Sequence, residues 1–169
     1  MIMLDLETLG TRPGSAIVAL GAVSFEPFDN KLGNFIVGTV GLVQPKMRIE
    51  GNTVGWWMKQ SQQTREITFP DQPTWPNIED MLDAFTAFYD GSELWSHGAA
   101  FDIVLLEAAY HRHGRRTPWS YRQIRDTRTL FALRPDVKVP FDGTMHSAID
   151  DACHQAKWVQ SVYHAIGEK

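Results

Sequence analysis

The chain has 169 residues, a length typical of one folded domain with a substantial apolar core. Hydrophobic residues make up 43% and charged residues 21%, which excludes a disordered or low-complexity chain. The formal net charge is −4, and the one cysteine, Cys153, excludes an internal disulfide. We therefore expect a single domain over residues 1–169, with the cytoplasm as the default compartment.

The apolar segments are too short for a membrane span. The longest of them, Ala16 to Phe25, has about ten residues, whereas a spanning helix needs ~20. The N-terminal residues Met1 to Asp5 carry no basic side chain, so we expect no signal peptide. The sequence thus predicts a soluble protein that does not enter a membrane.

Three strands are expected in the first quarter of the chain. Short runs rich in Val, Ile and Ala predict strands at Met1–Asp5, Ala16–Phe25 and Asn34–Val43. The intervening segment Glu26–Gly33 contains Pro, Asp-Asn and Gly, which are turn signals. Because the runs are closely spaced, we expect them to pair as an antiparallel group.

The spacing of the apolar residues becomes helical from Asn52 onward. Asn52 or Thr53 is a candidate cap for a helix that reaches Trp57 to Gln60, and Gln62–Ile67 either continues it or forms a second helix. After a proline-rich loop, Asn77 is a candidate N-cap. The apolar residues that follow it at helical spacing are Ile78, Met81, Leu82, Phe85 and Phe88.

Helices and two short strands alternate in the second half. We expect strands at Glu93–His97 and Tyr121–Arg125, and a helix at Ala99–His113 with Val104, Leu105, Ala108 and Ala109 facing inward. Asp126 is expected to cap a short helix to Leu133, and Ser147 with Asp150 to form a capping box for a helix to about Ile166. The order predicts an α/β fold, a mixed sheet of three antiparallel strands plus two short strands, flanked by helices.

Asp5 and Glu7 stand two residues apart at the end of the first predicted strand. Such side chains point to the same face of a strand, so the two carboxylates approach and repel one another. A divalent cation such as Mg²⁺ or Mn²⁺ would compensate that repulsion. The alternative is a frayed strand with two solvent-exposed acids.

Two further segments carry acids at helix starts. Asp102 follows the small residues of Ser96–Ala100 and opens a helix, where the alternative role is a favourable interaction with the helix dipole. His146 lies just before the last helix and Asp151 just inside it, whereas Asp150 has a structural role as a capping residue.

In combination these residues point to phosphoryl transfer. Two divalent ions about 4 Å apart can hold the attacking and leaving oxygens of an in-line displacement, and carboxylates are the ligands they prefer. A histidine with a pKa near neutrality can take the proton of an attacking water. The required set would be Asp5, Glu7, Asp102 and Asp151 with His146.

The motifs Asp5–Gly10, Phe101-Asp102 and His146-x-Ala148-x-x-Asp151 resemble the three exonuclease motifs of the DEDDh, or DnaQ-like, 3′→5′ exonucleases. Thr53-x-x-Trp56-Trp57 and the run Arg125–Thr129 resemble the branch that holds phage exonucleases and the small mycobacterial exoribonuclease. The resemblance spans nearly the whole chain and implies a ribonuclease-H-like fold.

The resemblance also implies residue roles. Asp5 would bridge two Mg²⁺ or Mn²⁺ ions, and Glu7 and Asp151 would bind the first, where the attacking water sits. Asp102 would serve the second ion through water. His146 would be the general base. The segment around Thr8 and Leu9 would meet the terminal nucleotide, and further substrate contacts are expected from Trp56, His97 and Phe101.

Half of the 16 lysines and arginines fall within residues 111–138. The segment His111–Arg116 could steer an anionic strand toward the acids, and the alternative is a solvated helix end. Of the adjacent Trp56 and Trp57, at most one faces the core squarely, and the other is a candidate for stacking on a base.

The sequence therefore predicts a metal-dependent 3′→5′ exonuclease that releases nucleoside monophosphates from single-stranded DNA or 3′ overhangs. A 3′→5′ exoribonuclease acting on RNA 3′ ends is the first alternative. A nucleic-acid-binding module without catalysis and an endonuclease on the same fold are the others. A homodimer is possible from the resemblance, because relatives often form one.

Overall fold

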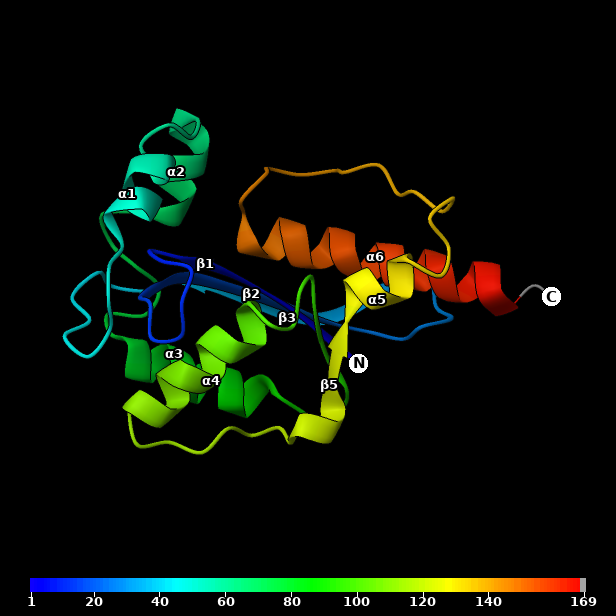
Figure 1. Ribbon diagram of the computed structural model, residues 1–169, viewed down its shortest axis with the longest axis horizontal. Helices are drawn as coiled ribbons and strands as arrows, with labels where there is room; N and C mark the ends of the chain where they lie inside the picture. Colours follow the sequence, from blue (N-terminus) through cyan, green and yellow to red (C-terminus); the bar gives the residue numbers. More distant parts are fainter. Residues whose placement is uncertain (168–169) are drawn as a thin grey trace.

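The computed structural model describes residues 1–167, which form a five-stranded sheet with the order β3-β2-β1-β4-β5 (Figure 1). The central strand β1 (Ile2–Thr8) pairs antiparallel with β2 (Ile17–Phe25) and parallel with β4 (Leu94–Ser96). Strands β3 (Leu32–Thr39) and β5 (Ile124–Asp126) form the two edges. The predicted mixed sheet, with three antiparallel strands and two short ones, is confirmed.

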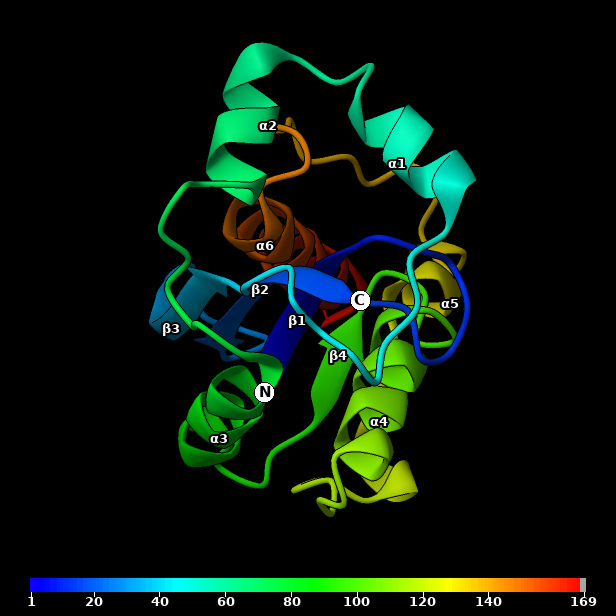
Figure 2. The ribbon, with the colours of Figure 1, turned by 90° about the vertical axis from the view of Figure 1, so that its left-hand side faces the viewer.

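Helices cover both faces of this sheet (Figures 1 and 2). Helices α3 (Ile78–Phe88) and α4 (Asp102–Arg112) lie on one face, and α5 (Thr127–Phe131) and α6 (Ala148–Gly167) lie on the other. Helices α1 (Gly51–Trp57) and α2 (Gln62–Thr68) stand beyond the end of the sheet where β1 ends. Within residues 1–167, no helix is both long and apolar enough to cross a membrane.

The alternation of β1 divides its side chains between two apolar clusters. Ile2, Leu4 and Leu6 belong to the cluster that also contains the buried side chains of α3 and α4. Met3 belongs to the smaller cluster formed with α6. Because side chains alternate along a strand, Asp5 and Glu7 share the face of Met3. The two acids therefore face α6.

Helix α6 begins in close contact with the middle of β2. A Cβ atom built on Gly21 would lie 2.4 Å from the carbonyl carbon of Ala148 and 2.4 Å from the backbone nitrogen of Ile149. Only a residue without a side chain allows the first turn of α6 to approach the sheet this closely. This approach brings Asp151, in the same turn, over the strand that carries Asp5 and Glu7.

The strand boundaries differ from those expected. β1 runs on to Thr8 because it stays paired with β2 as far as Ile17. β3 begins and ends earlier than the predicted Asn34–Val43, since its pairing with β2 ends at Thr39 and the chain then turns toward Trp75. The first half of the predicted strand Tyr121–Arg125 is instead a 3-10 turn, and β5 starts at Ile124.

Two predicted helix caps are confirmed: the side chain of Asn77 accepts from Asp80 N, and that of Asp126 accepts from Arg128 N. The caps expected for α1 are wrong, because α1 already begins at Gly51. For Gln62–Ile67, the alternative of a second helix is correct, because Ser61 caps the separate helix α2.

The inward face of α4 also differs from the expected one. Val104 and Ala108 are only half-buried. The fully buried apolar side chains of the helix are Ile103, Leu105, Leu106, Ala109 and Tyr110. Tyr110 is accommodated because its hydroxyl donates to Leu82 O, which satisfies the polar group inside the core.

The substitution Gly21→Ala is expected to destabilise the protein by more than about 2 kcal/mol, because the new methyl group meets backbone that cannot rotate away. The matched control is Gly55→Ala in α1, where nothing lies within 4 Å of the added Cβ. This change should be neutral or stabilise by up to about 1 kcal/mol through helix propensity. The midpoints of urea unfolding measure the stability of both variants. Equal midpoints would contradict the close contact between Gly21 and the first turn of α6.

Candidate active site

Asp5 and Glu7 meet α6 as the strand alternation predicts. The Nε2 atom of Gln155, on α6, donates to Asp5 Oδ1 at 2.9 Å. Glu7 lies two residues further along β1, and only 8% of its surface is exposed. The two carboxyls thus occupy the buried boundary between the central strand and the last helix.

Asp102 joins this pair from the opposite helix layer. It is the first residue of α4, and its Oδ1 accepts a hydrogen bond from Leu6 N at 3.3 Å. Since Leu6 stands between Asp5 and Glu7 in the sequence, this bond connects the start of α4 to the backbone of the acidic pair. Asp102 is itself buried, with 4% of its surface exposed.

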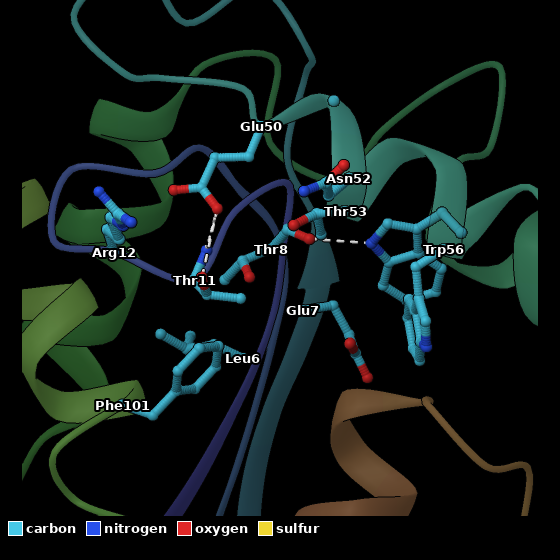
Figure 3. Close-up of a pocket in the computed structure, with 12 residues that line it drawn as sticks. Leu6, Glu7, Thr8, Thr11, Arg12, Glu50, Asn52, Thr53, Trp56 and Phe101 are labelled. Atoms are coloured by element: carbon cyan, nitrogen blue, oxygen red, sulfur yellow. Dashed lines mark hydrogen bonds between the residues drawn. The ribbon is translucent and has the colours of Figure 1, made fainter.

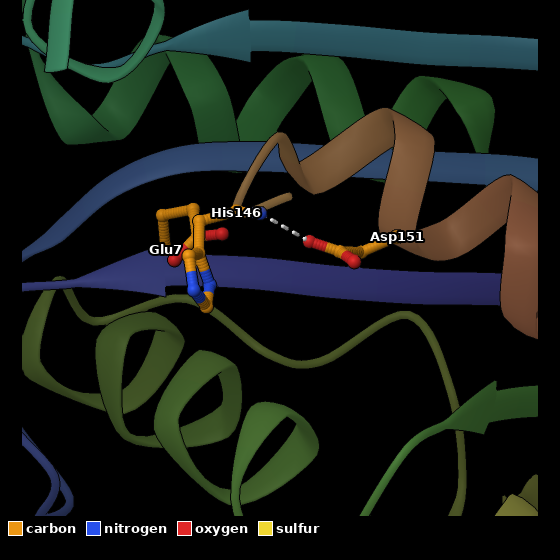
Figure 4. Close-up of side chains that lie close together, drawn as sticks. All are labelled: Glu7, His146 and Asp151. Atoms are coloured by element: carbon orange, nitrogen blue, oxygen red, sulfur yellow. Dashed lines mark hydrogen bonds between the residues drawn. The ribbon is translucent and has the colours of Figure 1, made fainter. Parts of the chain in front are cut away.

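The third motif closes the group from the start of α6 (Figure 4). His146 N donates to Asp151 Oδ2 at 3.0 Å, so Asp151 also satisfies a backbone group ahead of its own helix. Glu7, His146 and Asp151 each offer one ligand atom, and these atoms lie within 4.8 Å of one another. Two segments far apart in the sequence therefore converge here, and Asp102 adds a third through its bond to Leu6 N.

The backbone of His146 is held in an uncommon conformation. Its φ angle is 63°, in the left-handed region that only a few per cent of residues other than glycine adopt. The adjoining loop is tied to α2, because Thr64 Oγ1 donates to Met145 O at 3.3 Å. Asp150 Oδ2 accepts from Thr144 N at 2.9 Å, which gives Asp150 a structural role with a different partner from the expected capping box.

Burial raises the pKa of these carboxyl groups, and neighbouring carboxylates raise the pKa of Asp5 and Glu7 further. Burial raises the pKa of Glu7 to about 9, and the negative charges of Asp151 and Asp102 add to the effect. Burial raises the pKa of Asp102 to about 7. The pKa of Asp5 lies well above its usual range because of burial and then the charges of Asp102 and Glu7.

This donor set fits divalent cations. Carboxylate oxygens are the ligands that Mg²⁺ and Mn²⁺ prefer, and burial together with neighbouring carboxylates disfavours the ionised forms of Asp5 and Glu7. A bound cation would reverse this balance by favouring the ionised forms. The acidic group is therefore a candidate metal centre.

An open pocket of about 860 Å³ adjoins the acidic group (Figure 3). Its walls come from the end of β1, the loop that follows, both ends of α1 and the segment before α4. The lining residues are Leu6, Glu7, Thr8, Thr11, Arg12, Glu50, Gly51, Asn52, Thr53, Trp56, Trp57 and Phe101. Glu7 belongs both to this wall and to the acidic group, so a molecule in the pocket would touch the carboxylates.

The two adjacent tryptophans have different positions. Trp57 is 3% exposed, and its Nε1 donates to Thr8 O at 2.8 Å, which fixes the end of β1. Trp56 is 42% exposed and lies edge-on to the His146 ring, with the ring centroids 4.9 Å apart. Trp56 is therefore the tryptophan with a ring face available to a ligand.

The other expected substrate contacts divide between the pocket and its surroundings. Thr8 and Phe101 line the pocket. The side chain of Leu9 is buried in the core. His97 is half-buried outside the pocket lining, and its Nδ1 lies 2.8 Å from Thr127 Oγ1. Contact of Leu9 and His97 with a substrate remains a prediction.

The basic segment His111–Arg116 lies at the C-terminal end of α4, whereas Asp102 lies at its N-terminal end. Three of its side chains have partners in the protein: Arg112 donates to Lys46 O, His113 pairs with Glu79, and Arg115 pairs with Asp83. These contacts give most of this segment a structural role at the end of α4 and do not support a role in steering the strand.

Two residues of the site, Gln155 and Glu50, were not predicted from the sequence. Gln155 stands four residues after Asp151, a helical spacing that places both on one face and could have identified it. Glu50 reaches the pocket wall, where its Oε2 accepts from Thr11 N at 3.1 Å and from Thr11 Oγ1 at 3.2 Å. No local pattern marks Glu50, because its contact spans 39 residues of sequence.

Solved structures with the same fold are nucleases. The nuclease domain of 3′hExo, a DEDDh family member bound to rAMP, has a TM-score of 0.71 at 10% identity over 97% of this chain and 91% of that one. Exonuclease X in complex with 5′ overhanging duplex DNA has a TM-score of 0.58 at 21% identity over 99% and 93%.

The zinc-bound E. coli ExoI–ssDNA complex has a TM-score of 0.71 at 16% identity, and the match covers 99% of this chain and 41% of that one. The chain thus spans less than half the length of that ExoI chain. The sheet and its helices define the ribonuclease-H-like fold of DEDDh exonucleases.

The family follows from the sequence of the chain as a whole. The model of the 3′-5′ exoribonuclease Rv2179c-like domain matches residues 1–163, and the chain belongs to this family. No curated protein is detectably similar in sequence. The chain is a 3′→5′ exonuclease domain, as the three motifs predict.

Glu7→Gln is expected to stabilise the metal-free protein at pH 8 by more than about 1 kcal/mol. A carboxyl with a pKa raised from 4.5 to about 9 binds more protons in the folded state than in the unfolded state between these values. The wild type in EDTA should therefore lose stability as the pH rises from 5 to 9, and the variant should lose less.

Chemical denaturation across this pH range, in EDTA, measures the effect. The control is Glu26→Gln, which changes an exposed glutamate in the turn after β2 and should leave the profile unchanged. Parallel profiles for the wild type and Glu7→Gln would contradict the electrostatic cost assigned to Glu7.

Proposed function

We propose that the chain uses two divalent metal ions, Mg²⁺ or Mn²⁺, to release nucleoside monophosphates from the 3′ ends of single-stranded nucleic acid. The observation that carries this proposal is the convergence of the Asp5, Glu7, Asp102 and Asp151 carboxyls with His146 at the edge of the pocket. A pocket of about 860 Å³ is large enough for a nucleotide.

The four carboxyls would hold the cations. Asp5 would bridge the two ions, Glu7 and Asp151 would bind the first, and Asp102 would serve the second. Gln155 would orient Asp5 through its hydrogen bond to Oδ1, and Leu6 N would orient Asp102 in the same way. When bound, such ions stabilise the charge that develops on the phosphate oxygens during an in-line displacement.

His146 would act as the general base. Within residues 1–167 its imidazole makes ring contacts with Trp56 and Trp57 and no hydrogen bond, so a ring nitrogen is available to take a proton from the attacking water. The backbone bond to Asp151 and the tether of Met145 to Thr64 hold the residue beside the acids. A base of this kind needs to lie within hydrogen-bond reach of the water.

The pocket would receive the 3′-terminal nucleoside. Trp56 and Phe101 offer aromatic faces for stacking, and Thr8 lies where the pocket meets the acidic pair. Leu9 would contribute through the backbone around it. With the nucleoside seated here, its 5′ phosphate would lie over the carboxyls, which would limit cleavage to one terminal nucleotide at a time.

The choice between DNA and RNA is part of the experiment. The resemblance to phage exonucleases favours single-stranded DNA or 3′ overhangs over RNA, whereas the matched family is described as an exoribonuclease. The structural relatives include one bound to rAMP and one bound to ssDNA. We therefore propose the class that these share, a single-stranded 3′ end. A cytoplasmic location and a homodimer remain predictions.

Matched 5′-labelled single-stranded DNA and RNA, incubated with Mn²⁺, Mg²⁺ or EDTA, test the proposal. We expect a ladder that shortens from the 3′ end, present with metal and absent with EDTA. Asp5→Asn should abolish the ladder while keeping the fold, because it removes the shared ligand. Asp29→Asn, in the exposed turn between β2 and β3, is the control and should keep full activity.

Activity retained in purified Asp5→Asn would refute the proposed metal centre. Metal binding without a product on either strand would favour a binding module without catalysis, and cleavage of circular strands would indicate an endonuclease. The faster of the two ladders identifies the preferred sugar.

His146→Ala is expected to lower kcat by about 10²- to 10⁴-fold, the usual contribution of a general base. Its affinity for Mn²⁺, measured by titration calorimetry, should change little, because the carboxyls remain. A collapse of metal affinity instead would show that His146 is a ligand, as its closeness to Glu7 and Asp151 also permits.

A further inference from the structure

The run Arg125–Thr129 has no part in the chemistry described above, yet it lies beside the acidic group. Asp126 connects it to the turn between β4 and α4, because Oδ1 accepts from Arg128 N at 2.8 Å and Oδ2 accepts from Ala99 N at 2.7 Å. This turn leads directly into Asp102. The start of α5 is therefore fixed relative to the acidic group by one carboxylate.

The guanidinium of Arg128 lies over Gly98 in that turn. A Cβ atom built on Gly98 would be 3.3 Å from Arg128 Cζ, and the φ angle of Gly98 is +103°, which strains any other residue. Arg128 is exposed, and its side chain makes no hydrogen bond or ion pair with another of residues 1–167. By contrast, Arg115 pairs with Asp83, and Arg125 pairs with Glu93.

The positive charge of Arg128 acts to lower the pKa of two neighbouring groups, Asp102 and His97. Burial raises the pKa of Asp102, and the positive charge of Arg128 works against that increase. Burial and then the charge of Arg128 lower the pKa of His97, and His154 on α6 acts in the same direction. Arg128, His97 and His154 thus form a group next to the acids, and none of them lines the pocket.

We propose that Arg128 binds the phosphate of the nucleotide on the 5′ side of the scissile bond. This inference rests on the proposed function, because it takes the pocket as the seat of the terminal nucleoside. With that nucleoside in the pocket and its phosphate over the carboxyls, the rest of the strand has to leave on a side that the pocket does not occupy.

The chemistry of the side chain suits this role. The guanidinium presents a planar fork of donors that matches two phosphate oxygens. An anionic strand next to four carboxyls needs a positive charge outside the metal centre, and Arg128 supplies one without first breaking an ion pair. Gly98 leaves the turn open, so the guanidinium can lie close to the backbone that precedes Asp102.

Two substrates that differ in their upstream phosphates test this inference. A 5′-labelled single-stranded oligonucleotide has phosphates on the 5′ side of the scissile bond, whereas the p-nitrophenyl ester of thymidine 5′-monophosphate has only the scissile phosphodiester. Arg128→Gln should lower kcat/KM for the oligonucleotide by about tenfold or more, mainly through KM. It should leave hydrolysis of the ester unchanged.

The salt dependence gives a second readout that a purely structural role would not move. Loss of one phosphate contact to a single strand reduces the slope of log affinity against log salt by about 0.7. Arg128→Lys retains the charge and should restore most of this slope. Lys31→Gln is the control, because Lys31 is exposed in the turn between β2 and β3 and its loss should change neither readout.

Equal losses on both substrates would overturn the inference and place Arg128 at the scissile phosphate or behind Asp102. Unchanged kinetics and an unchanged salt slope would also overturn it. If Arg128→Gln fails to fold, Arg128→Met retains the stem over Gly98 and carries the same comparison. A wild type inactive on both substrates would refute the proposed function together with this inference, whereas an active wild type confines any failure to Arg128.

Discussion

The mutual repulsion of carboxyl groups at the boundary between β1 and α6 is the constraint on which the rest of the structure depends. Burial raises the pKa of Asp5, Glu7 and Asp102, and neighbouring negative charge adds to the effect at Asp5 and Glu7. Such a group destabilises a fold unless a core elsewhere compensates. Here the two apolar clusters on the faces of the sheet provide that compensation, and the acids stand at the edge of both.

Several contacts hold the last helix, α6, against this acidic boundary. Gly21 lets the first turn of α6 approach β2, and Gln155 connects the helix to Asp5. At its start, Asp151 binds His146 N, while α2 binds the preceding carbonyl through Thr64. A histidine in the left-handed region persists because these contacts determine its position from both sides.

Positive charge is distributed in two ways around this centre. Most basic side chains at the far end of α4 are bound to acids or carbonyls, as with Arg115 and Asp83. Arg128 differs because its guanidinium lies over Gly98 with no ion-pair partner among residues 1–167. The fold thus leaves a cation next to the carboxyls, whereas His113 and Arg115 at the far end of α4 are paired with acids.

By itself the sequence determined the fold class, the family motifs and the shared face of Asp5 and Glu7, because strand alternation and helix capping are local rules that a few neighbouring residues satisfy. Only the tertiary structure decided which tryptophan is buried, since Trp57 needs the distant carbonyl of Thr8 as its acceptor. It also decided the exposure of Arg128, because the partners that a side chain meets across the fold depend on packing, which no local pattern encodes.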